Sequence, residues 1–312
     1  SYFDRFGWWY AGIGLAMLAL VFVIGVERYG AKNWIQIGGF AMQPSEFVKI
    51  IFVFFVAAML YKNTSLKQIM LTSALAGVHV LMLVVEKDLG AAVIFFVTYI
   101  VMLYVATRRA MWPLMGLAAG AGASVVAYHL FDHVKRRVVA WKDPWGNYND
   151  AGYQIAQSLF AIGTGGWFGM GLYQGMPKDI PVRESDFIFA VIAEELGGFF
   201  AICLILVFMS CFIMFINISL RLTNNFYKLL AIGLSIAYGF QLFLCIGGVI
   251  KFIPHTGVTL PLISYGGSSI LSTIIVFAVI QGLYLLKQKE VKEIEEKRRE
   301  SEQRQWNDQT RV

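Results

Sequence analysis

Long apolar runs separated by short polar stretches divide this chain. Eight of the runs are long enough to cross a bilayer as helices, which takes roughly 17 to 25 residues, although the second and fourth are short. They cover residues 8–26, 47–61, 69–85, 91–106, 112–131, 196–218, 227–249 and 269–286. The pattern predicts an all-α integral membrane protein, a polytopic helical bundle with about eight spans.

Composition supports the same class. Hydrophobic residues make up 58% of the chain and charged residues only 15%, which excludes an ordinary soluble domain. Membrane lipid is therefore an expected partner, and no nucleic-acid partner is expected. Cys203, Cys211 and Cys245 lie inside apolar runs without metal-ligand spacing, so we interpret them as packing residues.

The spans and loops predict the domain organisation. Residues 1–286 form one membrane domain with a large outer loop at 132–186, and residues 287–312 form a charged, helical tail. The outer loop is rich in aromatic residues, which indicates a structured segment rather than disorder. Within it, residues 152–171 predict a short amphipathic helix and a glycine-rich turn. Close packing explains those glycines better than a phosphate cradle, since their spacing matches no P-loop.

The distribution of basic residues predicts the orientation. An even number of spans puts both termini on one side, and a cytoplasmic N-terminus places 15 of the 26 Lys and Arg residues inside. The positive-inside rule therefore favours cytoplasmic termini and an extracellular loop at 132–186. No cleavable signal peptide is visible at the N-terminus, which begins with Ser, and we expect sequence upstream of it.

The stretch 178–195 is where a water-facing loop enters an apolar helix. Asp186 stands at this junction, and Asp before a helix is either a favoured N-cap or a reactive group. As a cap it would meet the positive end of the helix, which lowers its pKa and weakens it as a base. Ser185 offers an alternative cap that leaves Asp186 free.

Other charged groups also lie at the ends of spans, where ionisable side chains are costly. Glu46 and Lys49 are three residues apart and either pair on one helix face or belong to a helix start capped by Ser45. Glu194 and Glu195 are about 100° apart around a helix, so at least one faces the protein interior. We expect them to have a structural or electrostatic role.

Two further outer segments have simpler interpretations. Glu86, Lys87 and Asp88 fit a polar connection between two spans. The last outer loop contains Pro254, Gly257 and Pro261 among apolar residues, which predicts a re-entrant segment buried in protein. Isolated histidines such as His79 fit hydrogen-bonded core positions, and we expect no histidine metal site.

Several motifs, in order along almost the whole chain, resemble one family. They are G-A-K-N-W-I-Q-I-G, Q-P-S-E-F-V-K, D-L-G-A-A, R-V-V-A-W-K-D-P, G-Y-Q-I-A-Q-S-L-F-A-I-G-T-G-G, D-F-I-F-A-V-I-A-E-E-L-G and P-H-T-G-V-T-L-P-L-I-S-Y-G-G-S-S. Together they are similar to the SEDS family (shape, elongation, division and sporulation proteins), the RodA and FtsW peptidoglycan glycosyltransferases. Four positions depart from the usual motifs, as in a divergent branch of the family: Asn33, Lys87, Val182 and Lys251.

The resemblance implies ten spans, so the first two are expected to be absent from this chain. It implies polymerisation of lipid II at the outer face of the bacterial cytoplasmic membrane, with Asp186 as the catalytic base and Trp34 as a further functional residue. It also implies a class B penicillin-binding protein, a single-span transpeptidase, as partner. A lipid II flippase and an inactive scaffold of a cell-wall synthase are the alternative functions.

This chemistry needs positive charge for the pyrophosphate leaving group more than a second carboxylate. Either side-chain cations or a bound divalent cation would supply it, and no other cofactor is expected. The candidate cations on the outer side are Lys32, Lys49, Arg136, Arg137, Lys142, Arg183 and Lys251. Glu46, Ser264 and Ser268 complete the residues expected to bind substrate.

Overall fold

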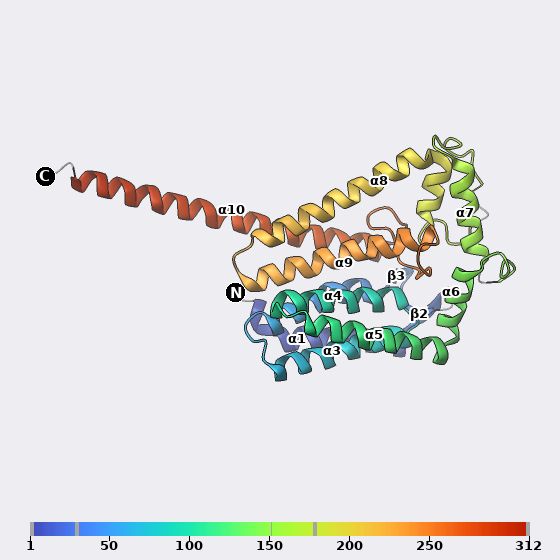
Figure 1. The fold of residues 1–312 in the computed structure, drawn as a ribbon, viewed down its shortest axis with the longest axis horizontal. Coiled ribbons are helices and arrows are strands. Elements are labelled where there is room, and N and C mark those ends of the chain that lie inside the picture. The colour runs from blue at the N-terminus through green and yellow to red at the C-terminus, as the bar shows by residue number, and fades with distance from the viewer. Residues whose placement is uncertain (1–2, 29–30, 151, 177–179, 310–312) are drawn as a thin grey trace.

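The computed structural model describes residues 3–28, 31–150, 152–176 and 180–309 of the chain. It is a bundle of long helices with two shorter helices and a small sheet at one end (Figure 1). The helices are η1 (Phe3–Phe6, a 3-10 turn), α1 (Gly7–Ile24), α2 (Pro44–Leu60), α3 (Leu66–Val85), α4 (Leu89–Thr107), α5 (Met111–Leu130), α6 (Asp132–Lys142), α7 (Tyr153–Gly165), α8 (Ile188–Arg221), α9 (Asn225–Val249) and α10 (Gly267–Gln309).

The eight predicted spans all correspond to helices. In the described chain, seven helices are long and apolar enough to cross a membrane: α1, α3, α4, α5, α8, α9 and α10. The remaining predicted span is α2, whose 17 residues place it at the short end of the membrane-spanning range. The helical membrane class is thus confirmed.

A three-stranded antiparallel sheet follows α1, and the sequence analysis missed it. The strands are β1 (Val26–Arg28), β2 (Ala31–Ile37) and β3 (Phe40–Met42), in that order. Gly38 and Gly39, at φ +54° and +87°, make the two-residue turn between β2 and β3. That glycine pair, flanked by alternating residues, was the available signal.

Helices α2 and α9 form the centre of the bundle, where α2 packs against α1, α3, α4 and α9. Aromatic residues of α2 surround His79 of α3, whose ring lies 5.4 Å from Phe52 and 5.8 Å from Phe55. The His79 Nδ1 atom is 2.8 Å from the carbonyl of Leu75. The prediction of a hydrogen-bonded core histidine is confirmed.

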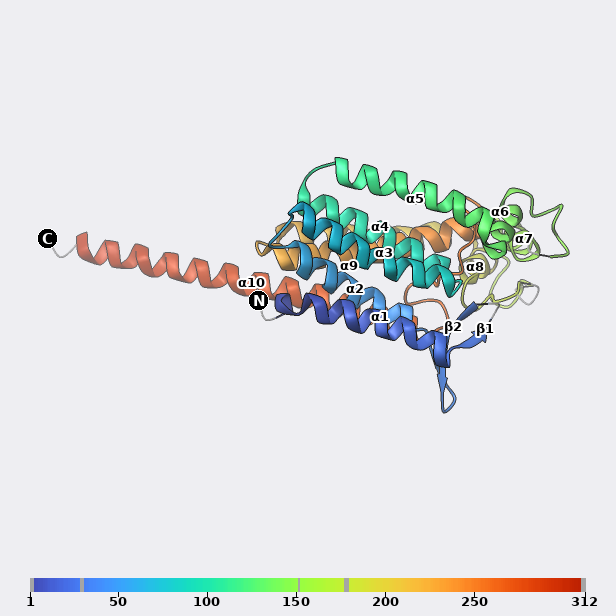
Figure 2. The same ribbon diagram turned by 90° about the horizontal axis from the view of Figure 1, so that it is seen from below.

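Helix α5 lies on the flank of the bundle (Figure 2) and buries none of its described residues. It touches α4 through small residues, because a Cβ on Gly116 would come within 2.2 Å of Ile100 and one on Gly120 within 2.4 Å of Phe96. Both glycines therefore allow the two helices to approach closely. The chain passes from this peripheral helix into α6 and the outer loop.

Helix α8 is broken at Gly197, which has φ 85° and ψ 171°. The break coincides with the predicted start of the sixth span, and the helical segment before it begins eight residues earlier than predicted. The glycine-rich turn after α7 fills the break: Met170 and Gly171 donate hydrogen bonds to the carbonyls of Glu194 and Glu195, at 2.9 and 3.0 Å. Close packing, the preferred interpretation of these glycines, is confirmed.

The two ends of the bundle differ. Helices α6 and α7 and the strands lie at one end, and η1 and the far end of α10 lie at or beyond the other (Figure 1). Helix α10 continues without interruption from the last span to Gln309, so the predicted helical tail is confirmed. Both ends of the described chain thus lie toward the end of the bundle opposite α6 and α7 (Figure 1).

Candidate active site

Asp186 lies at the corner where the outer loop enters α8. Its backbone N–H donates to the carbonyl of Val182 at 3.2 Å, and the residue that begins α8 as N-cap is Phe187, with no side-chain cap. Ser185 also turns back to Val182, to whose carbonyl its hydroxyl donates at 3.4 Å. Both cap hypotheses are therefore wrong, and the Asp186 carboxylate is not engaged with the helix end.

The last outer loop holds this corner in place. The Ser264 hydroxyl donates to the carbonyl of Ser185 at 2.5 Å, and the N–H of Tyr265 donates to the carbonyl of Glu184 at 2.7 Å. Gly257 passes directly beneath the carboxylate, since a Cβ there would lie 3.3 Å from Asp186 Oδ2. Its φ of +73° also favours glycine.

Arg137 of α6 supplies positive charge to the same corner. Its Nη1 donates to the carbonyl of Thr256 at 2.7 Å, which ties α6 to the last loop. The guanidinium interacts electrostatically with both Asp88 and Asp186. One cation therefore acts on both carboxylates.

The charge state of Asp186 reflects these surroundings. Burial raises the pKa of the Asp186 carboxyl above its ordinary value, and the charge of Asp88 raises it further. A hydrogen bond from Ser185 and the charge of Arg137 act in the opposite direction. A carboxylate with a raised pKa is a stronger base than one in water, which suits proton abstraction.

An aromatic contact joins the start of α8 to the last outer loop beside Asp186. Phe187 stacks on His255 of the last loop, with ring centroids 4.3 Å apart. Burial, together with the charge of Arg137, lowers the pKa of His255 to about 3. His255 is therefore neutral near pH 7 and adds no charge beside Asp186.

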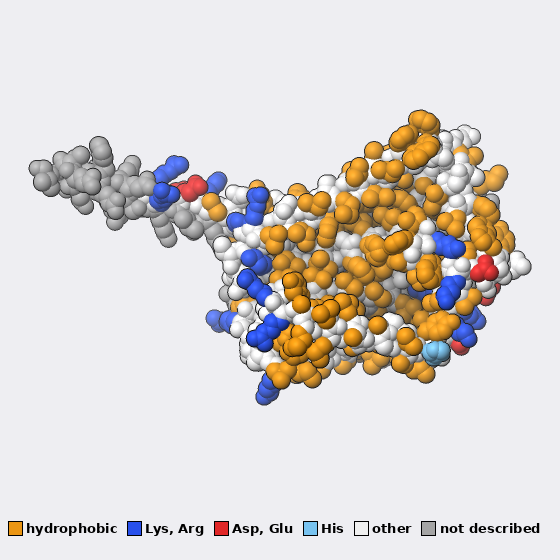
Figure 3. All heavy atoms as spheres, in the orientation of Figure 1, with side chains coloured by type: hydrophobic (Ala, Val, Ile, Leu, Met, Phe, Trp, Pro, Cys, Tyr) orange, Lys and Arg blue, Asp and Glu red, His pale blue; other side chains and the backbone are white. Residues whose placement is uncertain are grey.

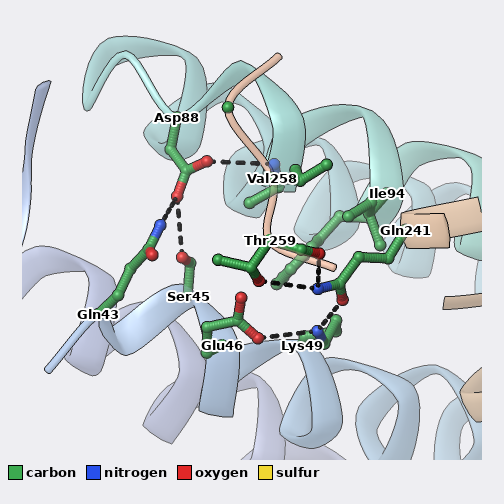
Figure 4. A pocket seen from close by; sticks show the side chains of 12 residues that line it. Gln43, Ser45, Glu46, Lys49, Asp88, Ile94, Gln241, Val258 and Thr259 are labelled. Carbon is green, nitrogen blue, oxygen red and sulfur yellow. Dashed lines mark hydrogen bonds and ion pairs between the residues drawn. The ribbon is translucent and has the colours of Figure 1, made fainter. Parts of the chain in front are cut away.

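A second polar cluster lies beside this corner, around a cavity of about 20 Å³ that is large enough for one water molecule (Figure 4). Asp88, the N-cap of α4, accepts hydrogen bonds from Gln43 at 2.7 Å and from Ser45 at 2.8 Å. The N-cap of α2 is Gln43, without a side-chain cap bond, so the expectation that Ser45 caps α2 is wrong. Ser45 instead links α2 to α4.

The predicted pairing of Glu46 and Lys49 is confirmed, at 2.9 Å between Nζ and Oε2. Lys49 also donates to Gln241 of α9 at 2.6 Å, and Gln241 donates to the carbonyl of Thr259 at 3.0 Å (Figure 4). Ser272 of α10 donates to Glu46 at 2.9 Å. One buried network thus joins α2, α9, α10 and the last loop, two residues along the chain from Gly257.

Other residues expected at the site lie elsewhere or act through their backbone. Lys32 is exposed and donates to the carbonyl of Phe22, and Arg136 lines a separate open hollow with Lys135 and Asp150. The carbonyl of Lys251 accepts a hydrogen bond from the Trp141 indole at 3.0 Å.

The remaining candidate residues are buried or half-buried. Trp34 is half-buried on β2 and pairs with Val26 of β1. Buried Ser268 accepts a hydrogen bond from the N–H of Gln43 at 3.4 Å. Glu194 is buried and accepts from the N–H of Met176 at 3.2 Å, whereas Glu195 is half-buried. One of the two glutamates thus faces inward, as the helical spacing predicted.

Sequence reasoning missed two residues that the structure brings to the site. Asp88 was assigned to a polar connection, although Asp directly before an apolar run is an N-cap signal. Gln241 is an amide in the middle of a membrane span, where a polar residue invites a functional explanation. Their contacts with Ser45 and Lys49 depend on the three-dimensional fold.

The described residues contain no group of three or more His, Cys, Asp or Glu side chains arranged to hold a metal ion. Magnesium, however, binds through one or two carboxylates together with substrate phosphates. Asp186 and Asp88, which both interact electrostatically with Arg137, would be the carboxylates for that mode.

Fold and site together define a polytopic helical membrane protein with a carboxylate and a guanidinium at one end of the bundle. The family described as "Cell cycle protein" (FtsW, RodA, SpoVE) matches residues 3–288, and the chain belongs to this family.

The chain is similar to curated members of that family. It is 38% identical to "Peptidoglycan glycosyltransferase RodA" of Mycobacterium tuberculosis over 301 residues, which cover 88% of this chain and 63% of that protein. It is 36% identical to "Probable peptidoglycan glycosyltransferase FtsW" of Aliivibrio salmonicida over 275 residues, 83% of this chain and 67% of that protein. The chain thus spans less than two thirds of the length of the RodA relative.

Solved structures share the fold. One comes from work on "Structural coordination of polymerization and crosslinking by a peptidoglycan synthase complex", with a TM-score of 0.78 and 26% identity over 92% of this chain and 82% of that chain. An aspartate-to-alanine variant of Thermus thermophilus RodA has a TM-score of 0.66 and 25% identity over 90% of this chain and 78% of that chain.

Proposed function

We propose that this protein is a peptidoglycan glycosyltransferase that polymerises lipid II. The single observation that carries the proposal is the Asp186 corner, where a carboxylate of raised pKa lies over Gly257 and beside Arg137. Family membership and the names of the relatives support the same activity.

In the proposed reaction, a sugar hydroxyl of one lipid II molecule attacks the anomeric carbon of a second lipid-linked glycan, to which undecaprenyl pyrophosphate is still attached. Asp186 takes the proton of that hydroxyl as the new bond forms, and the undecaprenyl pyrophosphate leaves with the electron pair of the broken bond. Arg137 stabilises the negative charge that develops on the leaving pyrophosphate. Alternatively, Asp186 or Asp88 would hold a divalent cation, which would supply that positive charge.

The polar network beside the corner gives the site its shape. Lys49, Glu46 and Gln241 are buried or nearly so and tied to one another, so they fix α2 and α9 against the last loop. We assign them a positioning role, because each already has a protein partner. Ser264 belongs to the same group, since it holds the backbone of Ser185.

The protein is a multi-pass membrane protein. We further propose that it lies in the bacterial cytoplasmic membrane with the Asp186 end outside and both termini in the cytoplasm. The basic residues support this orientation: Arg5, Lys62, Arg108, Arg221 and Lys228 all fall at the end of the bundle opposite α6.

We also propose a single-span class B penicillin-binding protein as partner. The structural relative described as coordinating polymerization and crosslinking supports this pairing, since cross-linking requires a second activity. Such a transpeptidase would act on the strands that this protein makes. Membrane lipid surrounds both.

The test is polymerisation of labelled lipid II by purified full-length protein, with products separated on a gel. We expect Asp186→Asn to lower the rate by a factor on the order of 10² to 10⁴, because the variant lacks the general base. The matched control is Glu184→Gln, an exposed neighbour in the same loop, which retains the rate. Near-normal polymer from the folded Asp186→Asn variant would overturn the assignment.

A further inference from the structure

The segment after α7, residues 166–176, is an apolar turn at the Asp186 end of the bundle, which we call the glycine turn. Its side chains point outward: Phe168 is 86% exposed and Tyr173 is 92% exposed. Other exposed large apolar residues of the turn are Trp167, Met170, Leu172 and Met176. No charged residue occurs anywhere from 151 to 177, which is unusual for a loop in water.

The glycine turn continues the apolar surface of α8. The ring of Phe199 on α8 lies 5.1 Å from Trp167 and 5.5 Å from Phe168. Beyond Phe199, the exposed side of α8 is a row of apolar residues: Phe200, Ile202, Leu206, Val207, Met209, Ile213 and Met214. Figure 3 shows hydrophobic side chains at the upper corner, over the end of α8. Because α8 is a membrane span, this side of the helix faces lipid.

The length of α8 places the turn at a definite depth. Arg221, at the far end of α8, marks one polar boundary of the bilayer. From Arg221 to Phe199 the helix is roughly 33 Å long at a rise of 1.5 Å per residue. The hydrocarbon core is about 30 Å thick, so Phe199 and the turn that touches it reach the opposite boundary.

The backbone of the turn also meets the demands of that environment, where unpaired N–H and C=O groups are costly. Gly198 and Phe199 donate to the carbonyls of Gly166 and Trp167, at 2.8 and 3.2 Å. Together with the bonds from Met170 and Gly171 to α8, these contacts pair the backbone groups at the helix break.

From these observations we infer that the glycine turn is a membrane-interface element: its aromatic and apolar side chains insert into the lipid leaflet at the Asp186 end of the bundle. Trp, Tyr and Phe favour the boundary between headgroups and acyl chains. The short part of α8 before the break at Gly197 begins beside Asp186. The glycine turn thereby anchors this part of α8 at the level of the lipid headgroups. The inference depends on the depth of α8 and not on the proposed enzymatic activity.

The test is fluorescence quenching by brominated lipid, with purified full-length protein alone in lipid nanodiscs. In a background with Ala at Cys203, Cys211 and Cys245, single cysteines replace Phe168 or Tyr173 and carry a bimane label. Phosphatidylcholine brominated near the top of the acyl chains is compared with the same lipid without bromine. We expect at least a twofold loss of fluorescence at both positions.

Two control positions bracket that result. Leu206→Cys, on the lipid-facing side of α8, should be quenched, and Asn149→Cys, exposed in the same outer loop, should be quenched by less than a tenth. The inference is overturned if positions 168 and 173 behave like position 149. It is equally overturned if they are shielded from aqueous iodide yet unaffected by brominated lipid, because protein rather than lipid would then cover them.

Discussion

At the level of single residues, the surroundings of Asp186 agree with its proposed role as the base. Burial raises the pKa of Asp186, and Arg137 limits that rise by favouring the ionised form. Ser264 holds the neighbouring backbone at Ser185, and Gly257 lies close to the Asp186 carboxylate. Burial thus makes the carboxylate more basic, while Arg137 favours its ionised form.

This balance predicts the effect of removing Arg137. In Arg137→Gln the pKa of Asp186 rises further, because the charge that lowers it is gone. Since only the ionised carboxylate accepts a proton, the acidic limb of kcat/KM against pH moves to higher pH, and activity falls more at low pH than at high pH. The profile is measured with purified protein and labelled lipid II.

The control for this profile is the neighbouring arginine. Arg136 lines a separate hollow, so Arg136→Gln should leave the acidic limb where it is in the wild-type protein. If the acidic limb of the Arg137 variant also lies at the wild-type pH, Arg137 does not lower the pKa of the base.

At the scale of elements, the break in α8 and the glycine turn form one unit. Gly165, Gly169 and Gly197 lie where any Cβ would meet backbone atoms of the other segment at 2.1 to 2.3 Å. The two segments can approach this closely only because these positions lack side chains.

Gly169→Ala should therefore destabilise the protein by at least about 2 kcal/mol, since the residue has φ +78° and its Cβ would come within 2.3 Å of the Glu195 carbonyl. The matched control is Gly163→Ala near the end of α7, where nothing lies within 4 Å of the added Cβ. Alanine there should be neutral or stabilising by up to about 1 kcal/mol. Thermal unfolding in detergent measures both, and equal midpoints for the two variants would contradict the packing argument.

The elements also show how far sequence reasoning reaches. Hydrophobic run length predicted every membrane helix, because a bilayer imposes a length that can be read directly. The strands β1 to β3 were missed, because they are short and lie between two strong helical signals. In the site, the Glu46–Lys49 pair could be predicted from charge at span ends. For Asp186 the residues left two hypotheses open, a helix cap or a reactive group, and the family resemblance singled out the second. The contacts of Asp88 and Gln241 could not, because they join helices that are distant in sequence.

At the scale of the whole molecule, the buried network of Glu46 and Lys49 holds the bundle together around the site. Lys49 is 7% exposed, and its partners come from α2 and α9. Lys49→Met would leave the Glu46 carboxylate buried without its cation, which costs about 3 to 5 kcal/mol. The double variant Glu46→Leu with Lys49→Met should lose less stability than Lys49→Met alone, because it leaves no unpaired buried charge.

Thermal unfolding in detergent distinguishes these variants. A lower midpoint for Lys49→Met than for the double variant supports the pair as a coupled unit. If the double variant loses as much as the two single changes added together, Glu46 and Lys49 act independently.

The proposed function is polymerisation of lipid II rather than its movement across the membrane. The most direct measurement uses full-length protein in liposomes with labelled lipid II and scores glycan polymer and transbilayer movement in the same sample. We expect glycan polymer from the wild-type protein and its loss in Asp186→Asn. Movement of lipid II between leaflets without any polymer would contradict it.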